Sequence, residues 1–121
     1  MEIDKQKRIR KEENKLMKIF RDAQTDKSTL NYIEASVNNL AWMAVALADL
    51  REEINKHGYV EIYNNGGGQS GTKDSVNVKA YNSLIKNYNS LLKTISAFLP
   101  ESDKKESKNE LADFLLGRDK K

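Results

Sequence analysis

Residues 28–58 read STLNYIEASVNNLAWMAVALADLREEINKHG. Apolar side chains recur along this stretch in alternating steps of three and four, a spacing that places them on one face of a helix. They are Leu30, Ile33, Val37, Leu40, Ala44, Leu47 and, after an interruption at Arg51, Ile54. Asp26 or Ser28 offers an N-cap, and Gly58 suits the end of a helix. The sequence therefore predicts one long helix.

The segment from Ala41 to Ala48 is apolar on nearly every side of this helix. A helix of that kind must be buried on several sides. In a chain of 121 residues, neighbouring subunits are an expected source of part of the cover. The sequence predicts a homo-oligomer, and the residues expected at subunit contacts are Leu40, Trp42, Met43, Leu47, Tyr81, Tyr88 and Leu91.

A second long helix is predicted from Asp74 or Ser75, either of which could be its N-cap, to about Leu99, just before Pro100. Its apolar stripe again alternates threes and fours, through Tyr81, Leu84, Tyr88, Leu91, Ile95 and Phe98, and Ile85, Leu92 and Leu99 widen it. Two amphipathic helices of similar length can bury their apolar faces against each other. We therefore expect a mainly α protein built on an antiparallel helical hairpin.

The segment between these helices is rich in glycine. Tyr59–Tyr63 alternates as a strand does, a second strand fits residues 69–73, and Asn65-Gly66 is a strong turn dipeptide. Gly66 and Gly71 have the spacing of a phosphate-binding P-loop, but the following Thr72-Lys73 reverses the order that this motif needs. We expect a small β-hairpin over residues 59–73 at the tip of the helical hairpin, and no nucleotide site.

Residues 1–25 are predicted to form a basic N-terminal helix. Ile9, Leu16, Phe20 and Ala23 share one face, and the first half carries little apolar content to hold it on the body. Basic side chains cover most of the remaining surface, and a helix of this kind can contact DNA phosphates. The candidate DNA-binding residues are Lys5, Lys7, Arg8, Arg10, Lys11, Lys15, Lys18 and Arg21. An ordinary solvated helix remains the alternative, because Glu12, Glu13 and Asp22 offset part of the charge.

Residues 26–99 form the predicted core, and residues 100–121 a tail. Residues 101–109 are polar and charged, which is typical of a flexible linker. Leu111, Phe114 and Leu115 then share one face of a short amphipathic helix. Such a face either hooks the groove of a partner or folds back on its own chain, and the reach of the linker favours a partner.

Composition argues against catalysis. The chain has no cysteine, one histidine (His57) and a net charge of +3, and no nucleophile, base or metal-ligand constellation is evident. We expect no enzyme activity, no cofactor and no metal. The longest apolar run, residues 40–48, is too short for a membrane span of about 20 residues. With no signal peptide evident, a cytoplasmic protein without membrane contact is expected.

Several short patterns in this order resemble the small terminase subunits of phages and prophages of Gram-positive bacteria. They are Leu47–Leu50, Gly58–Val60, Tyr63–Gly66, Gln69–Lys73, Tyr81–Tyr88, Leu99-Pro100 and the acidic-hydrophobic Glu110–Leu115. The resemblance extends over about residues 16–116. It rests on a linear pattern and not on catalytic residues.

The resemblance implies a ring-forming adaptor in viral genome packaging, working in the cytoplasm of the bacterial host. Such subunits bind viral double-stranded DNA, deliver it to the large terminase subunit, and regulate the ATPase and nuclease of that partner. Many have a helix-turn-helix, of which residues 1–25 offer at most half. The alternative is a helical protein-interaction module that does not bind DNA, such as a small regulator or an antitoxin-like partner.

Overall fold

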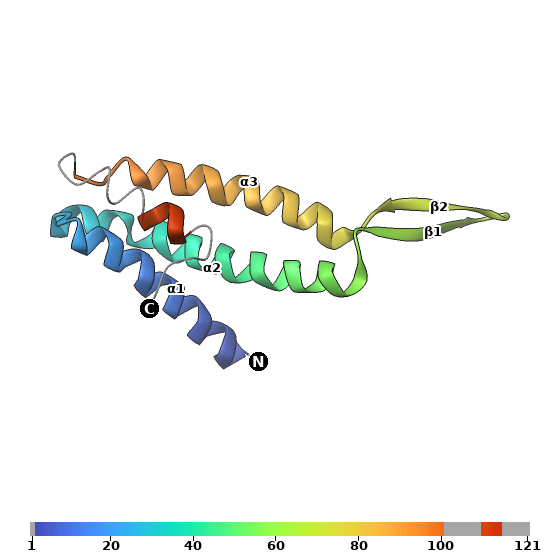
Figure 1. Ribbon diagram of the computed structural model, residues 1–121, viewed down its shortest axis with the longest axis horizontal. Helices are drawn as coiled ribbons and strands as arrows, with labels where there is room; N and C mark the ends of the chain where they lie inside the picture. The colour runs from blue at the N-terminus through green and yellow to red at the C-terminus, as the bar shows by residue number, and fades with distance from the viewer. Residues whose placement is uncertain (1, 101–109, 115–121) are drawn as a thin grey trace.

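The computed structural model describes residues 2–100 and 110–114 and is mainly helical. In chain order, its elements are helix α1 (Glu2–Asp22), helix α2 (Lys27–His57), strand β1 (Val60–Gly66), strand β2 (Gln69–Asp74) and helix α3 (Val76–Ser96). Residues 110–114 add a single helical turn, called here the C-terminal turn. Figure 1 shows α2 and α3 side by side, with the two strands projecting beyond their joined ends.

The predicted antiparallel helical hairpin is confirmed, and so are the signals that begin and end its helices. The Asp26 carboxylate accepts a hydrogen bond from the Thr29 N–H at 2.7 Å, which caps α2. The Ser75 Oγ accepts one from the Val78 N–H at 3.0 Å, which caps α3. At the end of α2, Gly58 has φ +87° and donates its N–H to the Ile54 carbonyl at 2.7 Å.

The β-hairpin is also confirmed, but its turn was predicted two residues too early. β1 and β2 pair antiparallel from Val60↔Asp74 to Gly66↔Gln69, which leaves Gly67 and Gly68 as the loop. Both loop residues have positive φ, +58° and +80°, as a two-residue hairpin turn of the primed type needs. The pairing is irregular between Asn64 and Gly66, so the Asn-Gly pair lies in a bulge before the loop.

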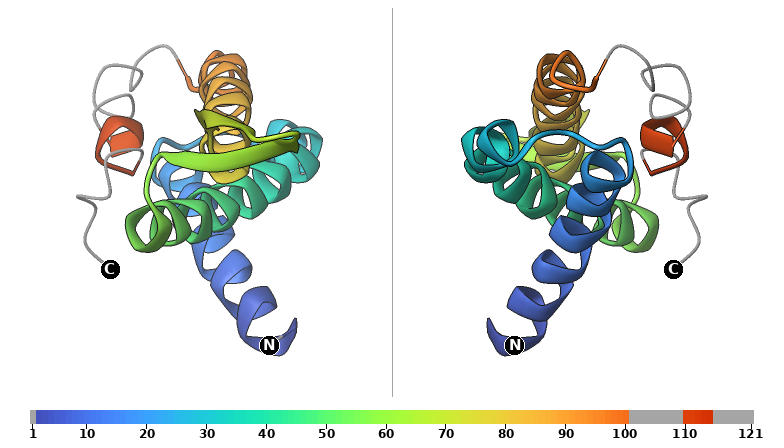
Figure 2. Two further views of the ribbon diagram at one scale, coloured as in Figure 1. Left: turned by 90° about the vertical axis from the view of Figure 1, so that its right-hand side faces the viewer. Right: turned by 90° about the vertical axis from the view of Figure 1, so that its left-hand side faces the viewer.

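Helix α1 lies antiparallel to α2, because residues late in α1 meet residues early in α2. Arg8 bonds Asp49, whereas Glu13 accepts a hydrogen bond from Asn38. Leu16 and Phe20 are fully buried in the core, and the first residues of α1 are exposed and diverge from the helical pair (Figure 2). The two-sided cover on α2 thus comes from α1 and α3.

This cover corrects the interpretation of the apolar segment 41–48, because the chain itself buries most of it. Three of the predicted subunit-contact residues, Leu40, Leu47 and Tyr88, lie in the core of the single chain. Met43, Tyr81 and Leu91 are half-buried against that core. Of the seven predicted subunit-contact residues, Trp42 is the most exposed, at 48%.

The last turn before Pro100 also differs from the predicted stripe. Phe98 is 38% exposed, and its ring lies tilted by 55° against that of Tyr32, with centroids 5.6 Å apart, while Leu99 is buried. After Ser96 the backbone bonds tighten to a three-residue spacing, as the Phe98 N–H donates to the Ile95 carbonyl. That tightening rotates Leu99 into the core and Phe98 toward its rim. Among the described residues, no helix is both long and apolar enough to span a membrane.

Candidate nucleic-acid interface

One face of α1 is built from basic and polar side chains, and is called here the outer face. It comprises Lys7, Lys11, Asn14, Lys18 and Arg21, which follow one another in steps of four, three, four and three. That spacing keeps them on one side of the helix, opposite the buried Leu16 and Phe20. All five side chains are exposed. Packing of α1 against α2 therefore turns this face away from the core.

The acidic residues in the middle of α1 lie on its packed side. Glu12 and Glu13 are half-buried, and Glu13 Oε1 accepts a hydrogen bond from Asn38 Nδ2 of α2 at 3.3 Å. Glu12 pairs with Lys15 at 3.4 Å. Glu12 and Glu13, which offset part of the positive charge in the sequence, are thus separated from most of the outer face.

At the end of α1, a carboxylate does reach the outer face. Asp22 Oδ2 lies 2.6 Å from Lys18 Nζ, and this hydrogen bond, with the negative charge of Asp22, raises the pKa of Lys18. Both side chains are largely exposed, so the pair is screened by solvent. Lys18 therefore stays protonated and remains accessible to an anion that competes with Asp22.

The other predicted DNA-binding residues are placed differently. Arg8 forms an ion pair with Asp49 at 2.8 Å and so links α1 to α2. Lys15 is half-buried beside Glu12, whereas Lys5 and Arg10 are exposed. The structure thus gathers the predicted cations over two sides of α1 rather than on one surface.

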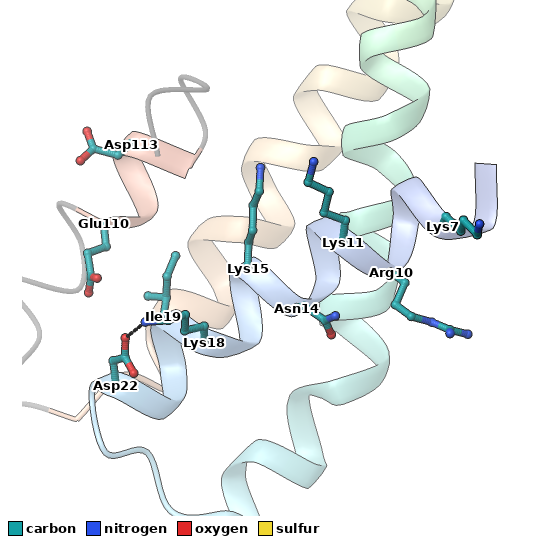
Figure 3. A pocket seen from close by; sticks show the side chains of 10 residues that line it. All are labelled: Lys7, Arg10, Lys11, Asn14, Lys15, Lys18, Ile19, Asp22, Glu110 and Asp113. Atoms are coloured by element: carbon teal, nitrogen blue, oxygen red, sulfur yellow. Dashed lines mark hydrogen bonds and ion pairs between the residues drawn. The ribbon is translucent and has the colours of Figure 1, made fainter. Parts of the chain in front are cut away.

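A groove of about 730 Å³ runs along α1 and brings part of this set together. Figure 3 shows Lys11 and Lys15 projecting from the same side of α1, with the C-terminal turn lying alongside the helix. The groove is lined by Lys7, Arg10, Lys11, Asn14, Lys15, Lys18, Ile19, Asp22, Glu110 and Asp113. Lys5, Arg8 and Arg21 are not part of it.

Sequence reasoning did not assign five of the lining residues to the site: Asn14, Ile19, Asp22, Glu110 and Asp113. Asn14 lies between Lys11 and Lys18 at the same helical spacing, on the same face of α1. Its place in the site could therefore have been predicted from the sequence. Glu110 and Asp113 were treated only as neighbours of an apolar motif. Nothing in the sequence indicates which helix they would lie against.

The C-terminal turn folds back on its own chain, the alternative that the sequence left open. Leu111 and Phe114 are 4% and 6% exposed, in the core cluster that also holds Leu16 and Phe20. Leu115, the third predicted partner-binding residue, lies outside the described residues, as does the expected linker 101–109. The two described apolar residues are thus occupied within the single chain.

Other candidate chemistry finds no support in the geometry. His57 lies 3.3 Å from Glu53 on the last turns of α2, as a surface pair. Within residues 2–100 and 110–114, no three His, Asp or Glu side chains gather as metal ligands would. The glycines from Gly66 to Gly68 form the hairpin loop, at the opposite end of the molecule from the groove (Figure 1). Comparisons of the chain with protein-family models, curated proteins and solved structures give no match.

Proposed function

We propose that this chain is a small terminase subunit: a homo-oligomeric adaptor that binds viral double-stranded DNA through α1. It delivers that DNA to the large terminase subunit and regulates the ATPase and nuclease of that partner during genome packaging. The resemblance of residues 16–116 to this family supports the biological role. The outer face of α1 supports the mode of contact, and it is the observation that carries the proposal.

The outer face fits the backbone of a duplex for electrostatic reasons. Lys7, Lys11, Lys18 and Arg21 are exposed along one side of a straight helix, and Glu12 and Glu13 lie on the other side. Lysine and arginine that neutralise phosphates release condensed counterions, and this release drives DNA binding without regard to sequence. A helix also fits the major groove. Several copies of α1 in one oligomer would add their weak fields.

The proposal is tested by removing three outer-face cations together, Lys7, Lys11 and Lys18, each to Ala. Because each phosphate contact contributes about 0.9 to the slope of log K against log salt, loss of three contacts should flatten that slope by roughly 2.7. Fluorescence anisotropy with a labelled duplex, between about 50 and 200 mM salt, measures the slope. An unchanged slope would remove the outer face from the DNA interface.

Helix α3 provides a matched control. Lys79, Lys86 and Lys93 recur every seven residues and are all exposed, so their triple Ala variant removes the same charge from another helix. We expect this variant to bind DNA nearly as the unchanged protein does. A larger loss than in the α1 variant would place the DNA on α3 instead.

Assembly into an oligomer needs apolar surface that the single chain leaves uncovered. Trp42 on α2 and the hairpin residues Tyr59, Val60 and Ile62 supply it, and Ile62 is 83% exposed. Multi-angle light scattering should give the mass of several chains, and Ile62→Lys combined with Trp42→Ser should lower that mass. A monomer at high concentration in the unchanged protein would contradict the oligomeric part of the proposal.

The same exposed apolar residues favour the second candidate, a helical protein-interaction module that does not bind DNA. The two proposals differ in one measurement, because the module should give no anisotropy change with a duplex at low salt. Pull-down with the large terminase subunit, using the full chain and a chain ending at residue 100, tests the partner. Equal capture by both would remove the tail from that contact.

A further inference from the structure

The C-terminal turn holds two kinds of side chain, acidic and apolar, which line different parts of the molecule. Leu111 and Phe114 are buried with Leu16 and Phe20 in the core. Phe114 also lines a second groove of about 350 Å³, together with Lys11 of α1 and Tyr88 of α3. The turn is therefore seated by its apolar side against α1 and α3.

The two acidic side chains of the turn lie in the groove along α1. Glu110 and Asp113 are both half-buried and share the lining of the groove with Lys11, Lys15 and Lys18. In Figure 3, Glu110 lies toward the Lys18 end of α1, whereas the Asp113 carboxylate points away from the helix. The charge of Glu110 contributes, after that of Asp22, to the raised pKa of Lys18. Two carboxylates thus share a groove with Lys11 and Lys18, two of the cations that the proposed function assigns to phosphate.

We propose that the C-terminal turn is a built-in competitor of DNA: Glu110 and Asp113 occupy the Lys11, Lys15 and Lys18 side of α1 until duplex phosphates displace them. This inference rests on the proposed function, because it concerns regulation of the same surface. The partner is a polyanion of regular phosphate spacing, and the occupant it displaces is a segment of the chain itself.

The acidic side chains can compete with DNA phosphates for two reasons: their charge, and the small apolar contact, Leu111 and Phe114, that holds the turn in place. Carboxylates beside a lysine neutralise it locally, so fewer condensed counterions are released when a phosphate arrives at that lysine. The anchor consists of two apolar side chains on one turn, a small contact compared with the packing of a whole helix. DNA that contacts two or three more lysines can therefore compensate for the loss of that contact.

The test compares the full chain with the variant Glu110→Gln/Asp113→Asn, which removes both charges and leaves Leu111 and Phe114 in place. Freeing up to two further phosphate contacts should steepen the salt slope by up to about 1.8 and tighten binding of a labelled duplex about tenfold at 0.1 M salt. The matched control Glu34→Gln/Glu52→Gln removes two exposed carboxylates from α2. Neither Glu34 nor Glu52 lines the groove, so this control should change the affinity by less than roughly twofold.

Amide hydrogen exchange of the unchanged full-length protein gives a second readout. Adding duplex DNA should speed exchange at residues 111–114, because displacement of the turn exposes its amides. Slower or unchanged exchange there, or equal affinity of the Glu110/Asp113 variant and the unchanged chain, would overturn the competition while leaving DNA binding intact. If neither chain binds the duplex at low salt, the proposed function fails and the competition fails with it.

Discussion

Replacement of Phe20 by Ala should detach α1 from the helical hairpin. The Phe20 side chain is fully buried, between residues of α1 and the other helices in the core cluster. Truncation of a buried phenylalanine to alanine costs about 3–5 kcal/mol, from lost transfer free energy and the cavity left behind. Against a total stability of about 5–15 kcal/mol, this is a large fraction. Since α1 has no other fully buried large side chain besides Leu16 among the described residues, its docking should fail first.

Urea unfolding followed by far-ultraviolet circular dichroism measures this cost. With a denaturant slope of about 2 kcal/mol per molar, a loss of 4 kcal/mol lowers the midpoint by roughly 2 M. Tyr32→Ala is the control, because Tyr32 is 75% exposed and its ring lies tilted against Phe98; its midpoint should fall by about 0.5 M at most. Both variants are measured at one protein concentration, because an oligomer unfolds in a concentration-dependent way. If Phe20→Ala shifts the midpoint no more than Tyr32→Ala, α1 is not docked as described and its outer face has no fixed orientation.

Four further predictions follow from single backbone and side-chain features. Gln24 has φ +62°, so Gln24→Gly should remove strain of about 1 kcal/mol and raise the melting temperature, and an unchanged or lower value would contradict this. The hydrogen bond from the Thr29 N–H lowers the pKa of Asp26, so its stabilisation is present above the unfolded-state pKa and is lost as the pH falls through the folded-state pKa. The advantage of the unchanged protein over Asp26→Asn, measured by urea unfolding, should therefore shrink between about pH 6 and pH 2, and an equal advantage at both would refute it. Gly67→Val should speed amide exchange throughout β1 and β2, because φ is +58° there, whereas Gly67→Asn should be tolerated; similar exchange in both variants would count against the turn geometry. Calorimetry should detect no magnesium-dependent ATP binding at residues 66–73, and a micromolar affinity would restore the nucleotide-site interpretation.

The elements of the hairpin could be predicted because local signals agree with the apolar pattern. Asp26 and Ser75 cap the helices that begin after them, and Gly58 ends α2 with a positive φ. The stripe through Ile33, Val37 and Leu40 is the buried face of α2. Each of these signals acts within a few residues of the element it specifies, so the sequence alone contains it.

The connection between α1 and α2 is a feature that could not be predicted from the sequence. The Thr25 N–H donates to the Phe20 carbonyl and the Gln24 N–H to the Arg21 carbonyl, which together form a Schellman motif with Gln24 in the left-handed region. Glycine or asparagine is usual at this position, so a glutamine there does not indicate the reversal of the chain. This reversal folds α1 back onto α2, and α1 then covers part of the apolar surface of α2.

The candidate site depends on that reversal as well. Helix α1 contains eight basic and five acidic residues, and from this composition alone DNA contact and a solvated surface were about equally supported. Once Leu16 and Phe20 are buried, however, the helix rotation is fixed, and each charged residue takes a definite side. Glu12 and Glu13 are then drawn to the packed side, where Glu13 meets Asn38, and Lys7, Lys11 and Lys18 remain outside. The separation of charge that supports phosphate binding is therefore a consequence of core packing, and a variant that frees α1 to rotate should weaken DNA binding without removing any cation.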